Sequence, residues 1–341
     1  MRAKSRLTAR FDPARLLTTR FDALQLGRPR RAKLKRAIAA LHRELAVRDI
    51  RLEPHVWFAD EWFSPDGIPG IAIPFYLAHA HLERLERRMS GYVEGGNEAS
   101  LMRILRHEAG HAVDTAFRLR RRKIWRATFG SPRAHYPSSY TARIGSREFV
   151  HHLDDWYAQA HPAEDFAETF AVWLAPGARW RSRYRGTPAL AKLEVMDALM
   201  QSVRGRVPPV RAAHRIDSVA SSRRTLGQHY ESMRRRRSRR DYSLLARHLA
   251  KVFVVARQVD REREAATWLQ RHRGTLVARA VRETDLDAYS ARQLLEACIE
   301  WCRDHRLQWV GAERRIAGEA GRGFVKLAQA GCRGGKLRFP L

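Results

Sequence analysis

The sequence has few cysteines and no long apolar run. Its three cysteines are too few for a disulfide scaffold, and Cys298 and Cys302 lie four residues apart instead of at the C-x-x-C spacing of a zinc knuckle. No stretch approaches 18 consecutive apolar residues, and the N-terminal segment lacks the apolar core of a signal peptide. We therefore expect a cytoplasmic protein with reduced thiols and no membrane partner.

Lysine and acidic side chains are also scarce compared with arginine. Only 8 of the 65 Lys and Arg residues are lysine, and 36 Asp and Glu leave a formal net charge of +29. Such a charge favours a polyanionic partner such as nucleic acid, although a GC-rich genome would also produce an arginine bias. Residues 201–250 hold 13 basic and 3 acidic side chains, whereas residues 151–200 hold 5 basic and 7 acidic ones. The positive charge is therefore concentrated outside the segment that carries the carboxylates discussed below.

The length of 341 residues suffices for one large domain or two ordinary ones. We predict four parts: an N-terminal helical segment (1–49), a core (50–204), a basic Arg-rich linker (205–240) and a helical C-terminal region (241–341). Apolar spacing, capping residues and turn residues predict the following elements: helices at 30–47, 76–89, 162–175 and 188–204, a helix capped by Asn97, strands at 50–58 and 71–75, and a long surface loop at 128–147.

The most informative motif is His-Glu-Ala-Gly-His at 107–111. Residues four apart lie on one face of a helix, so His107 and His111 can present two imidazoles to one ion. Glu108 is rotated by about 100° from them and can instead accept a proton from a metal-bound water. Two nitrogen ligands and a free carboxylate are what metal-assisted hydrolysis needs. The alternative is an ordinary surface helix that carries the motif by coincidence.

A catalytic zinc needs a third protein ligand. The metzincin pattern is excluded, because Asp114 and Phe117 stand where it requires glycine and histidine. A second amphipathic helix over 161–174 offers Glu164 as the ligand, with Glu168 one turn later to accept the free ring N–H of a ligand histidine. Asp114 lies on the stripe of His107 and His111 and could support a ligand in the same way. Alternatively, Asp114 pairs with an arginine and Glu168 is a solvated charge.

These residues carry a family resemblance. The segment HEAGHAVD at 107–114, followed by Tyr157, six residues and EDFAE at 164–168, resembles the gluzincin metallopeptidases and, distantly, their lethal-factor-like branch. It is closer still to a family of uncharacterised bacterial proteins described as zinc-binding metallopeptidases, over roughly residues 50–200. The resemblance does not cover the C-terminal third.

The resemblance implies a fold and an activity. The fold is α+β, with a zincin-like metallopeptidase core that is predominantly helical and a helical C-terminal extension. One Zn²⁺ per chain would be bound by His107, His111 and Glu164, Glu168 would support a ligand histidine, and Tyr157 would donate a hydrogen bond to the developing oxyanion. Tyr136 and Tyr140 are alternatives to Tyr157. The partner would be a peptide or protein substrate, which could pair with an edge strand at 71–75.

The predicted reaction is hydrolysis of a peptide bond by a metal-activated water, with Glu108 as the general base. Two other functions remain open. A zinc-binding scaffold without turnover would need the same ligands. A nucleic-acid-binding protein would use a run of arginines with no accompanying sequence-reading motif, and a solvated basic linker is the plain alternative for that run. The run comprises Arg234, Arg235, Arg236, Arg237, Arg239 and Arg240.

Overall fold

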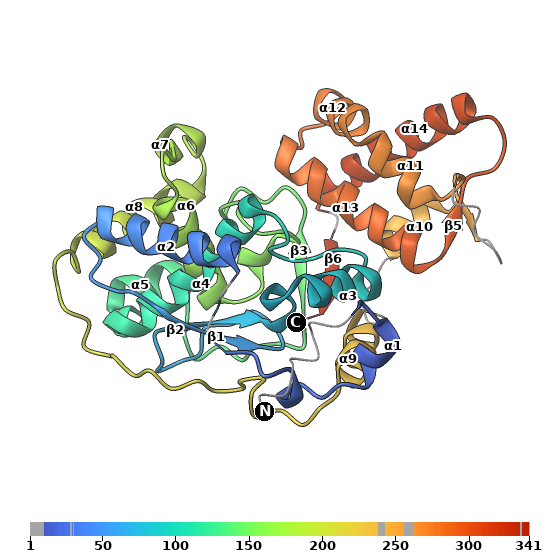
Figure 1. Cartoon of the computed structure of the whole chain (residues 1–341). Coiled ribbons are helices and arrows are strands. Elements are labelled where there is room, and N and C mark those ends of the chain that lie inside the picture. Colours follow the sequence, from blue (N-terminus) through green and yellow to red (C-terminus); the bar gives the residue numbers. More distant parts are fainter. Residues whose placement is uncertain are drawn as a thin grey trace. The chain divides into compact units, whose positions relative to one another are not determined.

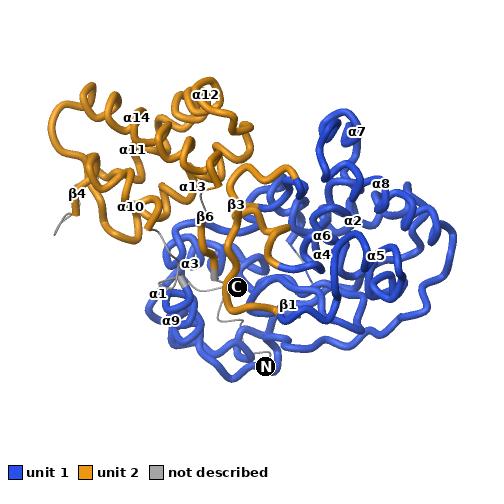
Figure 2. The backbone as a smooth tube through the Cα atoms, turned by 180° about the vertical axis from the view of Figure 1, so that it is seen from behind, with its two compact units in different colours: residues 1–135, 148–153, 161–238 blue, residues 136–147, 154–160, 239–341 orange. Residues whose placement is uncertain are grey.

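The computed structural model describes residues 10–27, 29, 31–237, 243–255, 262–334 and 336–340. The chain divides into two compact units (Figure 2). Unit 1 comprises residues 1–135, 148–153 and 161–238, and unit 2 comprises residues 136–147, 154–160 and 239–341. Two short segments that precede residue 161 in the sequence therefore group with the C-terminal hundred residues. The four-part division at residues 49, 204 and 240 remains a prediction.

Among its described residues, unit 1 is mainly helical with one pair of strands (Figure 1). Its helices and strands in chain order are α1 (Pro13–Thr18), η2 (Asp22–Leu24), α2 (Ala32–Val47), β1 (His55–Ala59), β2 (Gly70–Pro74), η3 (Phe75–Ala78), α3 (Ala80–Ser90), α4 (Glu98–Phe117), η4 (Leu119–Arg121), α5 (Lys123–Phe129), α6 (Pro162–Leu174), α7 (Trp180–Arg183), α8 (Pro188–Gln201) and α9 (Leu226–Arg237). Strands β1 and β2 pair in parallel, with His55 opposite Gly70 and Ala59 opposite Pro74.

The two long helices at the centre of unit 1 begin where the sequence predicts. The Asn97 side chain accepts a hydrogen bond from the Ser100 N–H at the start of α4, and the His161 ring accepts one from the Ala163 N–H at the start of α6. Pro162 occupies the first turn of α6 together with two acidic residues, an arrangement that suits the positive end of a helix. Local sequence signals therefore fix the positions along the chain of the side chains discussed below.

The core of unit 1 forms around these helices. Leu101, Leu105 and Val113 of α4 and Phe166 and Phe170 of α6 are buried in a single apolar cluster, to which α2, α5, α8 and β2 also contribute. Burial of a side chain of this size contributes about 1.5–3 kcal/mol each. The polar side chains of α4 that face α6 are thus surrounded by an otherwise apolar core.

The stretch 205–225 is irregular in conformation but is bonded to the core. The Val219 N–H donates to the Phe58 carbonyl (3.0 Å), and the Trp57 indole N–H donates to the Ile216 carbonyl (2.9 Å). Helix α9 follows within the stretch 205–240, whose role as a linker remains a prediction. Strand β2 has β1 on one side and a single bridge from Phe63 to Ala72 on the other, so part of its second edge is already occupied.

Unit 2 is a helical assembly with two small strand pairs. Its elements are β3 (Ser139–Arg143), η5 (Tyr157–Gln159), α10 (Ser243–Leu249), β4 (Val254–Val255), α11 (Ala265–Arg271), α12 (Arg273–Glu283), α13 (Ala288–Asp304), β5 (Leu307–Gln308), α14 (Glu313–Cys332) and β6 (Lys336–Pro340). Strands β3 and β6 lie side by side (Figure 2). They pair in antiparallel fashion, with Ser139 opposite Pro340. The prediction of a long surface loop over 128–147 is therefore wrong at 139–143, where β3 forms. The sequence did not indicate this strand, because its partner lies almost 200 residues further along the chain.

The predicted fold class is confirmed. Helices dominate the described residues, and the strands form only two-stranded pairs, so the fold is α+β and predominantly helical. A zincin-like core is consistent with this architecture. Among the described residues, no helix combines the length and the apolar character needed to cross a membrane.

Candidate metal centre

Helix α4 presents His107 and His111 on the face that packs against α6. The two residues are one turn apart, and their Nε2 atoms lie 3.2 Å from each other. The His107 side chain is buried, whereas that of His111 is 12% exposed, so the pair reaches the surface of unit 1 on the His111 side. Two imidazole nitrogens at this separation can bind one ion.

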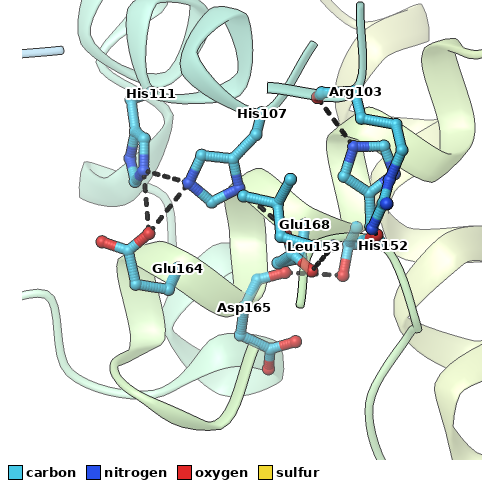
Figure 3. A network of polar contacts seen from close by, with 9 residues as sticks. Arg103, His107, His111, His152, Leu153, Glu164, Asp165 and Glu168 are labelled. Atoms are coloured by element: carbon cyan, nitrogen blue, oxygen red, sulfur yellow. Dashed lines mark hydrogen bonds and ion pairs between the residues drawn. The ribbon is translucent and has the colours of Figure 1, made fainter. Parts of the chain in front are cut away.

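Glu164 of α6 supplies a third atom able to bind a metal ion. Its Oε2 lies 3.0 Å from His107 Nε2 and 3.1 Å from His111 Nε2, so the three atoms form a nearly equilateral triangle (Figure 3). Ligand atoms at about 2.0–2.1 Å from a tetrahedral zinc ion lie about 3.3 Å apart. The donor set and its spacing therefore fit a zinc-type ion, and among the described residues these three form a group able to hold a metal.

Gly110 allows the two helices to approach closely enough for this geometry. A Cβ atom at Gly110 would lie 2.8 Å from the Cα atom of Ala167 and 3.2 Å from the Cβ atom of Phe170, which is closer than packed atoms allow. Ala167 stands between Glu164 and Glu168 in the sequence, so the point of closest approach lies beside both carboxylates. A glycine inside a helix costs about 1 kcal/mol relative to alanine, and here the close crossing of α4 and α6 accounts for it.

Glu168 orients the ring of His107. The His107 Nδ1–H donates to Glu168 Oε1 over 2.8 Å, and the other carboxylate oxygen accepts a hydrogen bond from the Leu153 N–H, also over 2.8 Å (Figure 3). With its proton held on Nδ1, the ring presents the Nε2 lone pair to the ligand triangle. The neighbouring His152 ring is bonded to the carbonyl of Arg103 (2.8 Å) and takes no part in the triangle.

The buried carboxylates of the cluster favour the binding of a cation. Burial acts to lower the pKa of His107, but its hydrogen bonds to Glu164 and Glu168 outweigh burial and raise that pKa well above its usual value. Burial acts to raise the pKa of Glu164, but His111 and His107 hold it well below its usual value. Two buried carboxylates therefore remain ionised around His107, and either a proton or a metal ion can supply the balancing positive charge.

Glu108 is buried, follows His107 in the sequence and lies outside the group able to hold a metal ion among the described residues. Its Oε2 atom is buried and has no hydrogen-bond partner among the described residues. Burial raises the pKa of Glu108. His107 and His111 act to lower that pKa, and Glu164 acts to raise it. An unpartnered buried carboxylate oxygen normally costs about 1–3 kcal/mol, so its retention here suits a group that exchanges a proton with a bound molecule.

The other predicted site residues lie in different surroundings. Asp114 accepts hydrogen bonds from the backbone N–H of Arg120 (2.8 Å) and from the Arg120 side chain (2.7 Å), which is the ion pair considered as its alternative role. Tyr157 begins η5 in unit 2, where its ring packs edge-on against Tyr140 with 6.2 Å between the ring centroids. Its role at the metal centre remains a prediction.

The predicted arginine run is only partly described. Arg234, Arg235, Arg236 and Arg237 end α9, and Arg239 and Arg240 lie outside the described residues. Arg235 is paired with Glu231, and Arg236 with Glu61 at 3.0 Å. At least two of the charges counted towards a polyanion site are therefore engaged in ion pairs within the chain.

Comparison with known proteins supports the metal centre. Residues 83–179 match the model of a family described as "Putative zinc-binding metallo-peptidase". No curated protein and no solved structure matches the chain. The matched segment contains His107, His111 and Glu164, and the predicted resemblance to zinc-binding metallopeptidases is confirmed for it. The match supports a peptidase that acts on peptides or proteins, and nothing in it supports nucleic-acid binding.

Two contributors to the site were not identified from the sequence. Gly110 lies inside the motif itself, and an unexplained glycine in a helix is a signal of close packing that could have singled it out. The Leu153 N–H, which holds Glu168, left no sequence signal, because any non-proline residue offers the same backbone donor.

Proposed function

We propose that the chain is a zinc-dependent peptidase of the gluzincin type that hydrolyses peptide bonds with Glu108 as the general base. The observation that supports the proposal best is the triangle of His107 Nε2, His111 Nε2 and Glu164 Oε2, with sides of 3.0–3.2 Å. Glu108 directly follows His107 in the sequence, and its Oε2 atom has no hydrogen-bond partner among the described residues. It therefore adds the proton acceptor that a plain structural site does not need.

A zinc ion held by the three ligands would polarise the substrate carbonyl and lower the pKa of a coordinated water towards 7. Glu108 accepts the proton of the attacking water and delivers it to the leaving amine. Glu168 keeps the proton of His107 on Nδ1 throughout, so that Nε2 remains a ligand. Burial of these carboxylates strengthens each interaction, because water competes little for their oxygens.

Tyr157 is proposed as the donor of a hydrogen bond to the developing oxyanion. The support is its position in the sequence, seven residues before the ligand Glu164, together with the gluzincin pattern that it resembles. Loss of one such donor costs about 10²–10³ in kcat. Tyr157→Phe is therefore expected to retain the metal and lose most of the activity.

The proposal is tested by measuring metal content and peptide hydrolysis together. The wild type should contain one zinc ion per chain by elemental analysis and should cleave members of a quenched fluorescent peptide library. Glu108→Gln should keep the zinc and lower kcat by about 10²–10⁴, which is the usual contribution of a general base. Glu164→Ala should lose both zinc and activity. Full activity in Glu108→Gln would exclude the proposed mechanism.

The same measurements separate the alternatives. A zinc-binding scaffold would show one zinc ion per chain, lost in Glu164→Ala, with no cleavage of any peptide by the wild type. If the chain contained no metal, even after reconstitution with Zn²⁺, the His107–His111 motif would be present by coincidence. Reconstitution with Co²⁺ or Mn²⁺ in parallel tests the choice of ion, since imidazole and carboxylate ligands suit several divalent metals.

A further inference from the structure

The turn that leads into Tyr157 has an unusual backbone. Asp155 and Trp156 are consecutive residues with φ of 60° and 54°, in the left-handed region that non-glycine residues rarely occupy. For a residue as bulky as tryptophan this conformation is an outlier, and two in succession require outside support. Strained backbone of this kind persists only where the surrounding structure fixes it, and it is frequent at functional sites.

Gln293 of α13 holds this turn through two hydrogen bonds. Its Oε1 atom accepts a hydrogen bond from the Asp155 N–H (3.0 Å), and its Nε2 atom donates one to the side chain of Asp154 (3.0 Å). Gln293 is buried, although most glutamines are exposed. Both ends of one amide are therefore used to hold two consecutive residues of the turn.

Strands β3 and β6 hold the apolar side of the turn. The Tyr140 hydroxyl on β3 donates to the Asp155 carbonyl (2.8 Å), and the Tyr140 ring stacks on Phe339 of β6 with 5.5 Å between the centroids. The Trp156 ring is buried in the same cluster, 6.3 Å from Phe339. The C-terminal strand thus packs against the residue that precedes Tyr157.

We infer that Gln293 and Phe339, both from the C-terminal hundred residues, are positioning residues for Tyr157. Gln293 and Phe339 touch the strained turn, and the turn sets where Tyr157 begins η5. All these residues belong to unit 2, whereas Glu164, seven residues after Tyr157, belongs to unit 1. This inference rests on the proposed role of Tyr157, and it assigns to the C-terminal region a task that the matched segment 83–179 does not reveal.

The first experiment observes Tyr157 without relying on activity. 3-Fluorotyrosine replaces all nine tyrosines, and the ¹⁹F signal of residue 157 is assigned by its absence in Tyr157→Phe. Gln293→Ala should shift or broaden that signal while leaving those of Tyr76 and Tyr230 in place. The double variant Asp154→Asn/Gln293→Glu exchanges donor and acceptor in the hydrogen bond between residues 154 and 293. It should restore the wild-type ¹⁹F signal of residue 157. An unchanged signal in Gln293→Ala would overturn the inference.

The second experiment is a double-mutant cycle on turnover. Gln293→Ala should lower kcat about tenfold to a hundredfold, with KM within about twofold and zinc content unchanged, because a small displacement of a catalytic group costs this much. In the Tyr157→Phe background the same substitution should have little further effect. Equal effects in both backgrounds would mean that Gln293 only stabilises unit 2, and would contradict the inference.

Controls separate positioning from general stability and from failure of the proposed function. Gln270→Ala, at an exposed position of α11, should change neither kcat nor the Tyr157 signal. Ile299→Val removes one buried methylene from α13, six residues after Gln293, and should change only the unfolding midpoint. If the wild type cleaves no peptide, the proposed function fails, and the ¹⁹F experiment alone still decides whether Gln293 holds Tyr157.

Discussion

Two buried histidines of unit 1 lie near carboxylates but have pKa values shifted in opposite directions. His107 and His229 are 2% and 4% exposed, and each has acidic neighbours. The pKa of His107 is raised well above its usual value, whereas burial lowers the pKa of His229 to about 4. Burial is therefore not what distinguishes them.

The difference lies in contact distance and in competing charge. His107 touches two buried carboxylates at 2.8 and 3.0 Å, whereas Asp60 lies 4.0 Å from His229, is 35% exposed and also faces Arg224 at 3.5 Å. The His229 ring instead packs edge-on against Phe75 and Tyr230. Ionised carboxylates in direct contact, as at His107, are the surroundings that a metal-binding histidine requires, whereas the aromatic surroundings of His229 are those of a core histidine.

The largest effect is expected when each of the two histidines, His107 and His229, is replaced in turn. His107→Ala should lower the metal content from one ion per chain to none, because only two ligands remain. His229→Ala should leave the metal content unchanged and should lower the stability of unit 1 through the lost aromatic packing. Elemental analysis after dialysis, with Zn²⁺ reconstitution as a control, checks both. Equal loss of metal in the two variants would remove the distinction between them.

The second prediction concerns pH. The folded-state pKa of His229, about 4, lies below its unfolded value of about 6.5. The unfolded chain therefore binds the extra proton between these values, and stability is lost as the pH falls through this range. The loss between pH 7 and pH 5 is about 2 kcal/mol. His229→Phe, which suits the aromatic cluster, should remove this part of the loss.

Urea unfolding of the chelator-treated protein at pH 7 and pH 5 measures this difference, because without metal the ligand residues titrate alike in both variants. The free energy of unfolding should fall less between the two pH values in His229→Phe than in the wild type. An identical fall in both would show that His229 is protonated in the folded state. The comparison with His107 would then lose its electrostatic basis.

The third prediction tests the close crossing of α4 and α6. Gly110→Ala should destabilise the protein by about 1–3 kcal/mol, since the new methyl group meets the Cα atom of Ala167 at 2.8 Å. It should also weaken metal binding, because the crossing that brings Glu164 to the histidines must widen. Gly274→Ala in α12 is the matched control, where nothing lies within 4 Å of the new atom, and it should be neutral or stabilising. Metal titration and thermal unfolding give the two readouts.

The site illustrates how far sequence reasoning reaches. Helical spacing gave the shared face of His107 and His111, and the amphipathic second helix gave Glu164 and Glu168, because these signals are local. The pairing of β3 with β6 and the support of Glu168 by Leu153 could not be predicted, since both depend on segments brought together by folding. Asp114 shows the same limit. The position of Asp114 on the same face of α4 as His107 and His111 was predictable. Its partner was not, because Arg120 lies beyond the end of α4.

The last prediction isolates the contact that orients His107. Glu168→Gln keeps an acceptor for the His107 Nδ1–H but replaces the oxygen that accepts from the Leu153 N–H with an amide donor, so one of the two bonds is lost. Metal affinity should fall about tenfold to a hundredfold, as it does when a carboxylate behind a ligand histidine is removed. Competition with a zinc-responsive dye measures this. Asp60→Asn, which alters the carboxylate nearest His229, should leave the affinity unchanged. If Glu168→Gln bound zinc as tightly as the wild type, the carboxylate contact would explain the raised pKa of His107 but not its ability to bind a metal.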